Sequence, residues 1–198
     1  MQTLLNFLIG CILACISFCI IISFEIDFKD IAINDTFNYS DLLKGARYSL
    51  FIAVAEELLF RYLPLRNYIN LKKKFSLRKL TMIGVSTSLL FGILHLNFDQ
   101  FPKLQILIFI SAISLFLATI WSKSISTAIG MHWSWNLIQG VIFNFEGSGK
   151  SLKAMLLTEV DHTFLPEMSN LIILTTLFEI VILYLIYKII LNKKSIAS

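Results

Sequence analysis

Ionisable side chains within apolar stretches of the sequence are the first candidates for chemistry. Glu56, Glu57 and Arg61 lie together in one such stretch as Glu-Glu-Leu-Leu-Phe-Arg, and His95 and His132 lie in two others. A charged group inside a membrane-spanning helix costs at least about 2.5–3.5 kcal/mol. Such groups are therefore expected to pair, to face a cavity or to take part in a reaction.

The two adjacent glutamates are predicted to differ in role. Glu57 and Arg61 are four residues apart, so they can pair on one face of a helix. Glu56 points about 100° away and lacks that partner. A carboxylate without a partner in an apolar site can take up and return a proton near neutral pH, as a general base must. The alternative is a charge cluster that only joins helices.

The histidines are ambiguous when each is considered alone, because a histidine near a helix end is more often a packed or interfacial residue. His132 and Asn136 are four residues apart, and Asn136 could donate to a developing oxyanion or bind a neighbouring helix. With the glutamates, the histidines could activate water by general base catalysis or by holding Zn²⁺ on Glu56, His95 and His132. The chain contains neither His-Glu-x-x-His nor Gly-x-Ser-x-Gly, so the motifs of soluble zinc proteases and serine hydrolases are absent.

The composition predicts that lipid surrounds much of the chain. Of its 198 residues, 57% are hydrophobic and 15% are charged, and the mean hydropathy is +0.76. A typical soluble domain is about 45–50% apolar and about 25% charged. The net charge is +4, but the basic residues cluster between and after apolar runs, which is typical of membrane topology and not of nucleic-acid binding. Cys11, Cys15 and Cys19 lie on one face at membrane depth, so no disulfide is implied.

Six apolar stretches are long enough to cross a bilayer as helices. They cover residues 3–24, 42–63, 80–97, 102–121, 125–145 and 171–191. With six spans, the basic loop at 66–79, Lys123 and the tail at 193–194 fall on one side, and the positive-inside rule makes that side cytoplasmic. The acidic segment 25–41, the turn 97–102 and the loop 146–170 then fall outside.

The sequence therefore predicts an all-α polytopic transmembrane helix bundle of about six spans in the plasma membrane, with both termini cytoplasmic. Residues 1–198 are expected to form a single domain. These spans place His95 about 10 Å from the depth of His132, and we expect helix tilt or a deeper start of the third helix to absorb the mismatch. Glu179 is expected to pair with a polar group in the bundle or to line a substrate path, and His162 to be solvated.

Taken in order, the three motifs resemble those of the CPBP family, the CAAX prenyl endopeptidases and their bacterial bacteriocin-processing relatives, also called the Abi family. That family is marked by Glu-Glu-x-x-x-Arg, Phe-x-x-x-His and His-x-x-x-Asn (or Asp) on three membrane helices. Here the motifs are Glu56–Arg61, Phe91–His95 and His132–Asn136. The resemblance covers about residues 45–140, which it implies are the catalytic core. Tyr62 stands where many members have glycine.

The resemblance implies an intramembrane endopeptidase that hydrolyses membrane-associated peptides or proteins. Glu56 would activate water, with Glu57 and Arg61 in support. His95 and His132 would bind a metal or the catalytic water, and Asn136 would stabilise the oxyanion. Members are often described as metalloproteases, so zinc is one option for this chain.

Two other functions are compatible with the sequence. A catalytically silent membrane scaffold or bacteriocin self-immunity protein could share the fold, although it would not need all the unfavourable polar residues. A small transporter could use the same groups as a proton or ion relay, but the sequence lacks paired broken helices and inverted halves. The predicted partners are the lipid bilayer and a peptide or membrane-protein substrate, and no nucleic acid.

Overall fold

The computed structural model describes residues 2–25, 31–70, 75–95, 103–143, 155–158 and 169–196. The predicted outer turn at 97–102, most of the loop at 146–170 with His162, and the basic residues 72–74 lie outside the described residues. The side chains of Lys193 and Lys194 lie outside them as well.

The described residues form six helical segments, one for each apolar stretch of the sequence. Two of the segments contain a π-helical turn, named η2 and η4. The segments are α1 (Gln2–Glu25), α2 (Tyr39–Glu57) continuing through η2 (Leu58–Tyr62) into α3 (Leu63–Ile69), α4 (Leu77–Leu94), α5 (Lys103–Ser122), α6 (Ile125–Leu137) continuing into η4 (Ile138–Ile142), and α8 (Ser169–Ile196). Two short strands, β1 (Ile31–Ile33) and β2 (Leu156–Thr158), pair antiparallel with Ile31 opposite Thr158.

Four helices in the described part of the chain are long and apolar enough to cross a membrane. They cover Gln2–Ser23, Leu77–Leu94, Gln105–Ser122 and Leu171–Ile189. The other two segments carry two of the motifs: α2–η2–α3 carries Glu56–Arg61, and α6–η4 carries His132–Asn136. The molecule is thus an all-α bundle of membrane-type helices, whereas six spans and cytoplasmic termini stay predictions.

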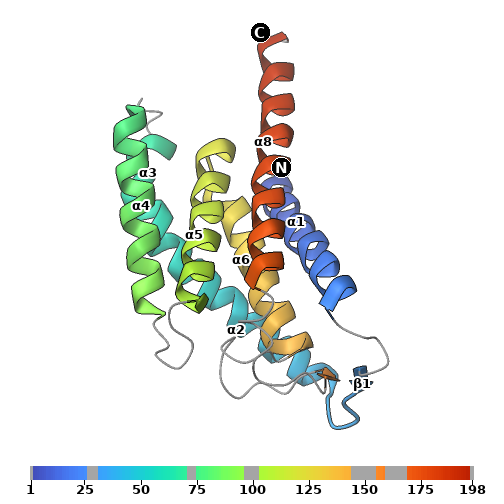
Figure 1. The fold of residues 1–198 in the computed structure, drawn as a ribbon. Coiled ribbons are helices and arrows are strands. Elements are labelled where there is room, and N and C mark those ends of the chain that lie inside the picture. The colour runs from blue at the N-terminus through green and yellow to red at the C-terminus, as the bar shows by residue number, and fades with distance from the viewer. Residues whose placement is uncertain are drawn as a thin grey trace.

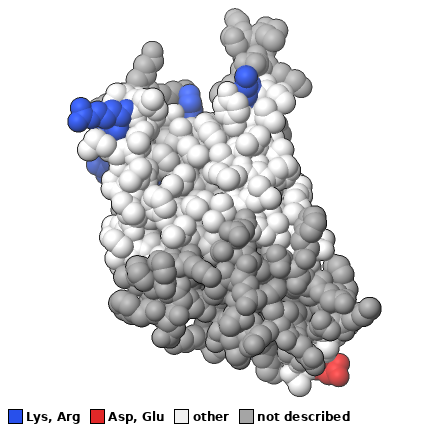
Figure 2. All heavy atoms as spheres, in the orientation of Figure 1, with Lys and Arg blue, Asp and Glu red and all other residues white. Residues whose placement is uncertain are grey.

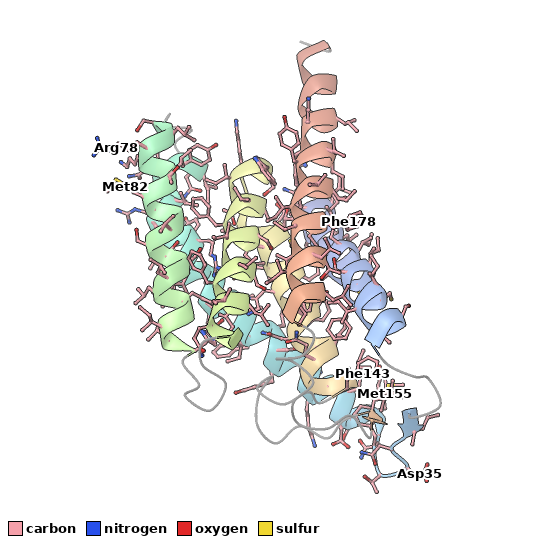
Figure 3. The ribbon with its side chains drawn as sticks, viewed as in Figure 1. Asp35, Arg78, Met82, Phe143, Met155 and Phe178 are labelled. Carbon is pink, nitrogen blue, oxygen red and sulfur yellow. The ribbon has the colours of Figure 1, made fainter. Side chains whose placement is uncertain are left out.

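The ends of the bundle differ in charge. In Figure 1, α1 begins and α8 ends toward the end of the bundle where α3 is followed by α4, and β1 lies at the opposite end. On the face that Figure 2 shows, basic side chains gather at the first of these ends and an acidic one lies at the other. Figure 3 labels Arg78 at the basic end and Asp35 at the opposite end, where the exposed bases Lys44 and Arg47 of α2 also lie. This separation agrees with the predicted grouping of the basic loops on one side.

Local sequence explains where the site-bearing helices begin and why one of them changes its pitch. Asn38 and Asp41 form a capping box at the start of α2, and Ser124 caps the start of α6. Pro64 lies in the first turn of α3, directly after the π turn. Because proline lacks an N–H and its ring clashes with the carbonyl four residues back, a widened turn lets the helix continue past it.

The helices α1 and α6 approach each other closely at two glycines. A Cβ atom added at Gly10 would lie 2.1 Å from the Thr127 carbonyl oxygen, and one added at Gly130 would lie 2.2 Å from the Phe7 carbonyl oxygen. No other residue type fits at these positions without a shift of the backbone. This contact places α6, which carries His132, in the interior of the bundle, where Met131 and Ala128 are fully buried.

Candidate active site

The pair predicted between Glu57 and Arg61 is present and buried. Nη1 of Arg61 lies 3.0 Å from Oε1 of Glu57, and the two side chains are 1% and 0% exposed. Nη2 of Arg61 donates to the Ala112 carbonyl of α5 at 3.1 Å. The guanidinium also lies over the Phe91 ring of α4, 4.8 Å from its centre. One arginine therefore joins the π turn of its own helix to both α4 and α5.

His132 approaches the same carboxylate from α6. Its Nδ1 lies 2.8 Å from Oε1 of Glu57, so this oxygen contacts both the histidine and Arg61. An ionised carboxylate can only accept hydrogen bonds, so Nδ1 of His132 carries the proton. In the neutral ring, Nε2 is then an acceptor, and it lies 3.4 Å from Oε2 of Glu56.

His95 approaches Glu56 from the other side. It is the residue that ends α4, and its Nδ1 donates to the Phe91 carbonyl at 2.8 Å. A backbone carbonyl can only accept, so Nδ1 again carries the proton and Nε2 remains an acceptor. Nε2 of His95 lies 3.7 Å from Oε1 of Glu56. The Glu56 carboxylate thus lies within 4 Å of both imidazoles, and the depth mismatch expected from the sequence is absorbed.

Phe91 is the residue that the sequence analysis left without a role. Its ring stacks on His95 at 4.3 Å between centres and meets His132 edge-on at 5.9 Å. It also lies under the Arg61 guanidinium and packs edge-on against Phe60. The spacing Phe-x-x-x-His was the available signal, because it puts an aromatic ring one helical turn before the histidine.

The cluster is buried on one side and accessible on the other. Glu57 and Arg61 are fully enclosed, and the His132 side chain is nearly so, whereas the side chains of Glu56 and His95 are 24% and 37% exposed. A molecule that approaches this cluster therefore meets Glu56 and His95 first. The buried members can orient the accessible ones but cannot themselves be reached without rearrangement.

Three polar atoms in this cluster are buried without a hydrogen-bond partner among the described residues. They are Oε2 of Glu56, Oε2 of Glu57 and Nε of Arg61. Buried polar groups in native proteins are nearly always hydrogen-bonded to protein or water. Three such atoms in one cluster are unusual, and they mark it as a candidate for function.

The geometry gives less support to Asn136 and to the predicted metal than to the other predicted site residues. Asn136 is partly buried, and no hydrogen bond or ion pair joins it to the cluster within the described part of the chain. Among those residues, no group of three or more His, Cys, Asp or Glu side chains is arranged to hold a metal ion. Zinc therefore stays a prediction that only metal analysis can test.

Comparison with protein families places part of the chain. Residues 38–138 match the protein-family model described as Rce1-like, type II CAAX prenyl endopeptidase Rce1-like. The matched range is about half of the chain and contains all six candidate site residues. No curated protein and no solved structure matches the chain.

Proposed function

The chain belongs to the Rce1-like family of type II CAAX prenyl endopeptidases, and from this premise we propose that it is an intramembrane endopeptidase in which Glu56 activates water. Its family and its apolar helices make it a multi-pass membrane protein of the CAAX protease type. The finer proposal concerns the roles of individual residues. All of them lie in the proposed catalytic core at about 45–140.

The observation that carries this mechanism is the position of the Glu56 carboxylate between two imidazoles, whose Nε2 atoms are acceptors when the rings are neutral. Oε2 of Glu56 and Nε2 of His132 face each other at 3.4 Å, and this oxygen is buried without a hydrogen-bond partner among the described residues. Two acceptors that face each other need a donor between or beside them. We propose that a water molecule beside this pair supplies the donor and presents its oxygen to a substrate on the accessible side, where Glu56 and His95 are exposed.

In the first step, Glu56 takes a proton from this water as the water oxygen bonds to the scissile carbonyl carbon. The carbonyl π electrons move onto the oxygen, which becomes an oxyanion. We assign the stabilisation of that oxyanion to Asn136 and the positioning of the water to His95 and His132. Glu57 and Arg61 hold His132 from behind.

In the second step, the oxyanion re-forms the carbonyl and the carbon–nitrogen bond breaks. The proton that Glu56 received passes to the leaving nitrogen, so that an amine and a carboxylic acid leave the site. Glu56 returns to its ionised form, and no net charge is gained or lost. A group that both accepts and returns the proton contributes about 10²–10⁴-fold to such reactions.

The proposed substrate is a membrane-associated peptide or protein. The accessible side of the cluster is formed by Glu56 of α2 and His95 after α4, and the side chains of Leu59 in η2 and of Leu90 and Leu94 in α4 are exposed and apolar. This surrounding suits a substrate delivered by the membrane. Prenylated substrates do not follow from the residues of this chain, and zinc enters no step of the proposed reaction.

The decisive experiment compares the purified protein with Glu56→Gln on membrane peptides. We expect cleavage to fall by about 10²–10⁴-fold because the amide cannot accept the proton. Asp35→Asn is the matched control, because it makes the same change at an exposed residue of the acidic end. The scaffold or immunity function is favoured if neither the purified wild-type protein nor the Glu56→Gln variant cleaves, and if cells that carry Glu56→Gln keep the wild-type phenotype.

Metal content is measured on the same preparations. Zinc that is bound by the wild-type protein and lost from His95→Ala and His132→Ala would place the ion at the site. Zinc that is absent from an active preparation would leave Glu56 and the imidazoles to act on water alone.

A further inference from the structure

Two polar pairs, one buried and one partly buried, connect α8 to α6 outside the cluster described above. Nε1 of Trp135 donates to Oε1 of Glu179 at 3.3 Å, and the hydroxyls of Thr127 and Tyr187 lie 2.8 Å apart. Glu179 is 2% exposed. Of the two alternatives expected for Glu179, the structure supports pairing within the bundle.

The two pairs occur at matching intervals. They are eight residues apart on both helices, from 127 to 135 on α6 and from 179 to 187 on α8. In Figure 1 these helices run in opposite directions, so the pairs form two rungs about 12 Å apart along the bundle. His132 lies on α6 between the rungs.

Both rungs continue to α1. The Trp135 ring packs edge-on against Phe18 at 5.2 Å, and the Tyr187 hydroxyl donates to Asn6 at 3.3 Å. A helix held at two levels from two directions cannot rotate about its axis without breaking a buried hydrogen bond. Trp135 is three residues from His132, about 60° around the helix, so its position determines where the imidazole points.

A buried carboxyl group is an unfavourable means of packing two helices. Leu183, four residues along the same face of α8, is fully buried in an apolar cluster with Leu115, Ala128 and Met131. An apolar residue at position 179 would avoid the free-energy cost of placing a carboxyl group at membrane depth. The presence of glutamate there indicates a requirement for its acceptor oxygen.

We propose that Glu179 is a positioning residue, which through Trp135 holds α6 in the rotation that presents His132 to Glu57. Glu179 lies outside residues 38–138, the range that matches the family, so this would be a contribution of the chain's own C-terminal helix. The part of the inference that concerns catalysis rests on the proposed endopeptidase function. The part that concerns the orientation of His132 does not.

The test compares Glu179→Leu, Glu179→Gln and the control Phe178→Leu in the full-length protein. Phe178, labelled on α8 in Figure 3, is exposed. We expect Glu179→Leu to lower kcat by about tenfold, as loss of a supporting hydrogen bond commonly does. KM should stay within about twofold, because the substrate does not contact this residue. Glu179→Gln keeps an acceptor oxygen for Trp135, so it should retain most of the activity.

A second measurement does not depend on activity. In protein labelled with ¹⁵N at histidine, the Nδ1–H signal that disappears in His132→Ala reports the bond to Glu57. We expect this signal to shift in Glu179→Leu and to return to its wild-type position in Glu179→Gln. If Glu179→Leu does not accumulate as folded protein, Trp135→Phe removes the donor while keeping an aromatic ring against Phe18.

The outcomes separate the two proposals. A shifted signal in a protein whose wild type cleaves nothing would support the positioning role and count against the endopeptidase. An unchanged signal together with unchanged kcat in Glu179→Leu would overturn the positioning role. Equal loss of kcat in the leucine and glutamine variants with an unchanged signal would also overturn it, because the charge and not the acceptor would then matter.

Discussion

Glu57 has the most constrained environment of the site residues, because one of its oxygens serves two partners. Arg61 lies 3.0 Å and His132 lies 2.8 Å from Oε1. The arginine supplies the positive charge that a buried carboxylate requires, and the carboxylate in turn fixes which nitrogen of His132 carries its proton. No described arginine lies within ion-pair distance of the adjacent Glu56, whose carboxylate faces the Nε2 atoms of His95 and His132.

We therefore expect Arg61→Met to destabilise the protein by about 3–5 kcal/mol, because it leaves the buried Glu57 charge without its partner. Thermal or denaturant unfolding in detergent measures this. Arg66→Met is the matched control, since Arg66 is exposed on the following turns of the same helical segment. A change within about 0.5 kcal/mol is expected there.

A double variant distinguishes loss of charge pairing from loss of packing. Neutralising Glu57 in the same chain, as Arg61→Met with Glu57→Gln, should recover part of the lost stability, because no unpaired charge remains buried. If the losses of unfolding free energy in the two single variants simply add in the double variant, the two residues do not interact in the way the distances indicate.

The residue pairs that the sequence predicted are those within one helix. The four-residue spacing of Glu57 and Arg61 is sufficient to predict their contact. The contacts of Glu57 with His132, and of Glu56 with both histidines, join residues far apart in the chain, and spacing carries no information about them. The order of the motifs predicted that these residues come together. Which nitrogen of each imidazole carries the proton could be assigned only from the positions of the Phe91 carbonyl and the Glu57 carboxylate.

At the scale of helices, the π turn η2 was not predictable from hydropathy. Its residues, Leu58–Tyr62, are as apolar as those of a regular turn except for Arg61. The widened turn accommodates Pro64 and occurs where Arg61 turns toward α4 and α5. π turns inside α-helices often occur at functional sites. A second one, η4, follows the His132 motif in α6.

The contact between α1 and α6 leads to a prediction at this scale. Gly10→Ala and Gly130→Ala each put a Cβ atom against a backbone carbonyl, 2.1 and 2.2 Å away. A backbone atom cannot move aside as a flexible side chain can, so the helices must separate. We expect each variant to lose about 1–3 kcal/mol of unfolding free energy.

Gly92→Ala is the matched control for these variants. Its new Cβ atom would lie 3.8 Å from the Gln105 carbonyl oxygen and 3.9 Å from the Phe109 side chain, which are ordinary contacts. Alanine is also the better helix former, by about 0.5–1 kcal/mol. If Gly10→Ala were as stable as Gly92→Ala, the close approach of α1 and α6 would not exist in the folded protein.

For the whole molecule, composition predicted the class, whereas the number of six spans stays a prediction. Among the described residues, four helices are long and apolar enough to cross a membrane, whereas α6 lies in the interior with Thr127, His132 and Ser134 buried. A helix enclosed by other helices needs neither the length nor the uniform hydropathy of one that contacts lipid. Hydropathy alone therefore identifies the long apolar helices around the site more reliably than the enclosed helix α6, which carries His132.

The orientation of the bundle in the membrane is the remaining prediction, and it follows from the charges at its two ends. Arg78 and Asp35 lie at opposite ends (Figure 3), and the positive-inside rule assigns Arg78 to the cytoplasm. In a chain whose Cys11, Cys15 and Cys19 are replaced by alanine, an impermeant thiol reagent should label Asp35→Cys in intact cells. It should label Arg78→Cys only after the cells are permeabilised. The opposite pattern would invert the topology, and labelling of neither variant until permeabilisation would contradict the plasma-membrane location while leaving the bundle itself intact.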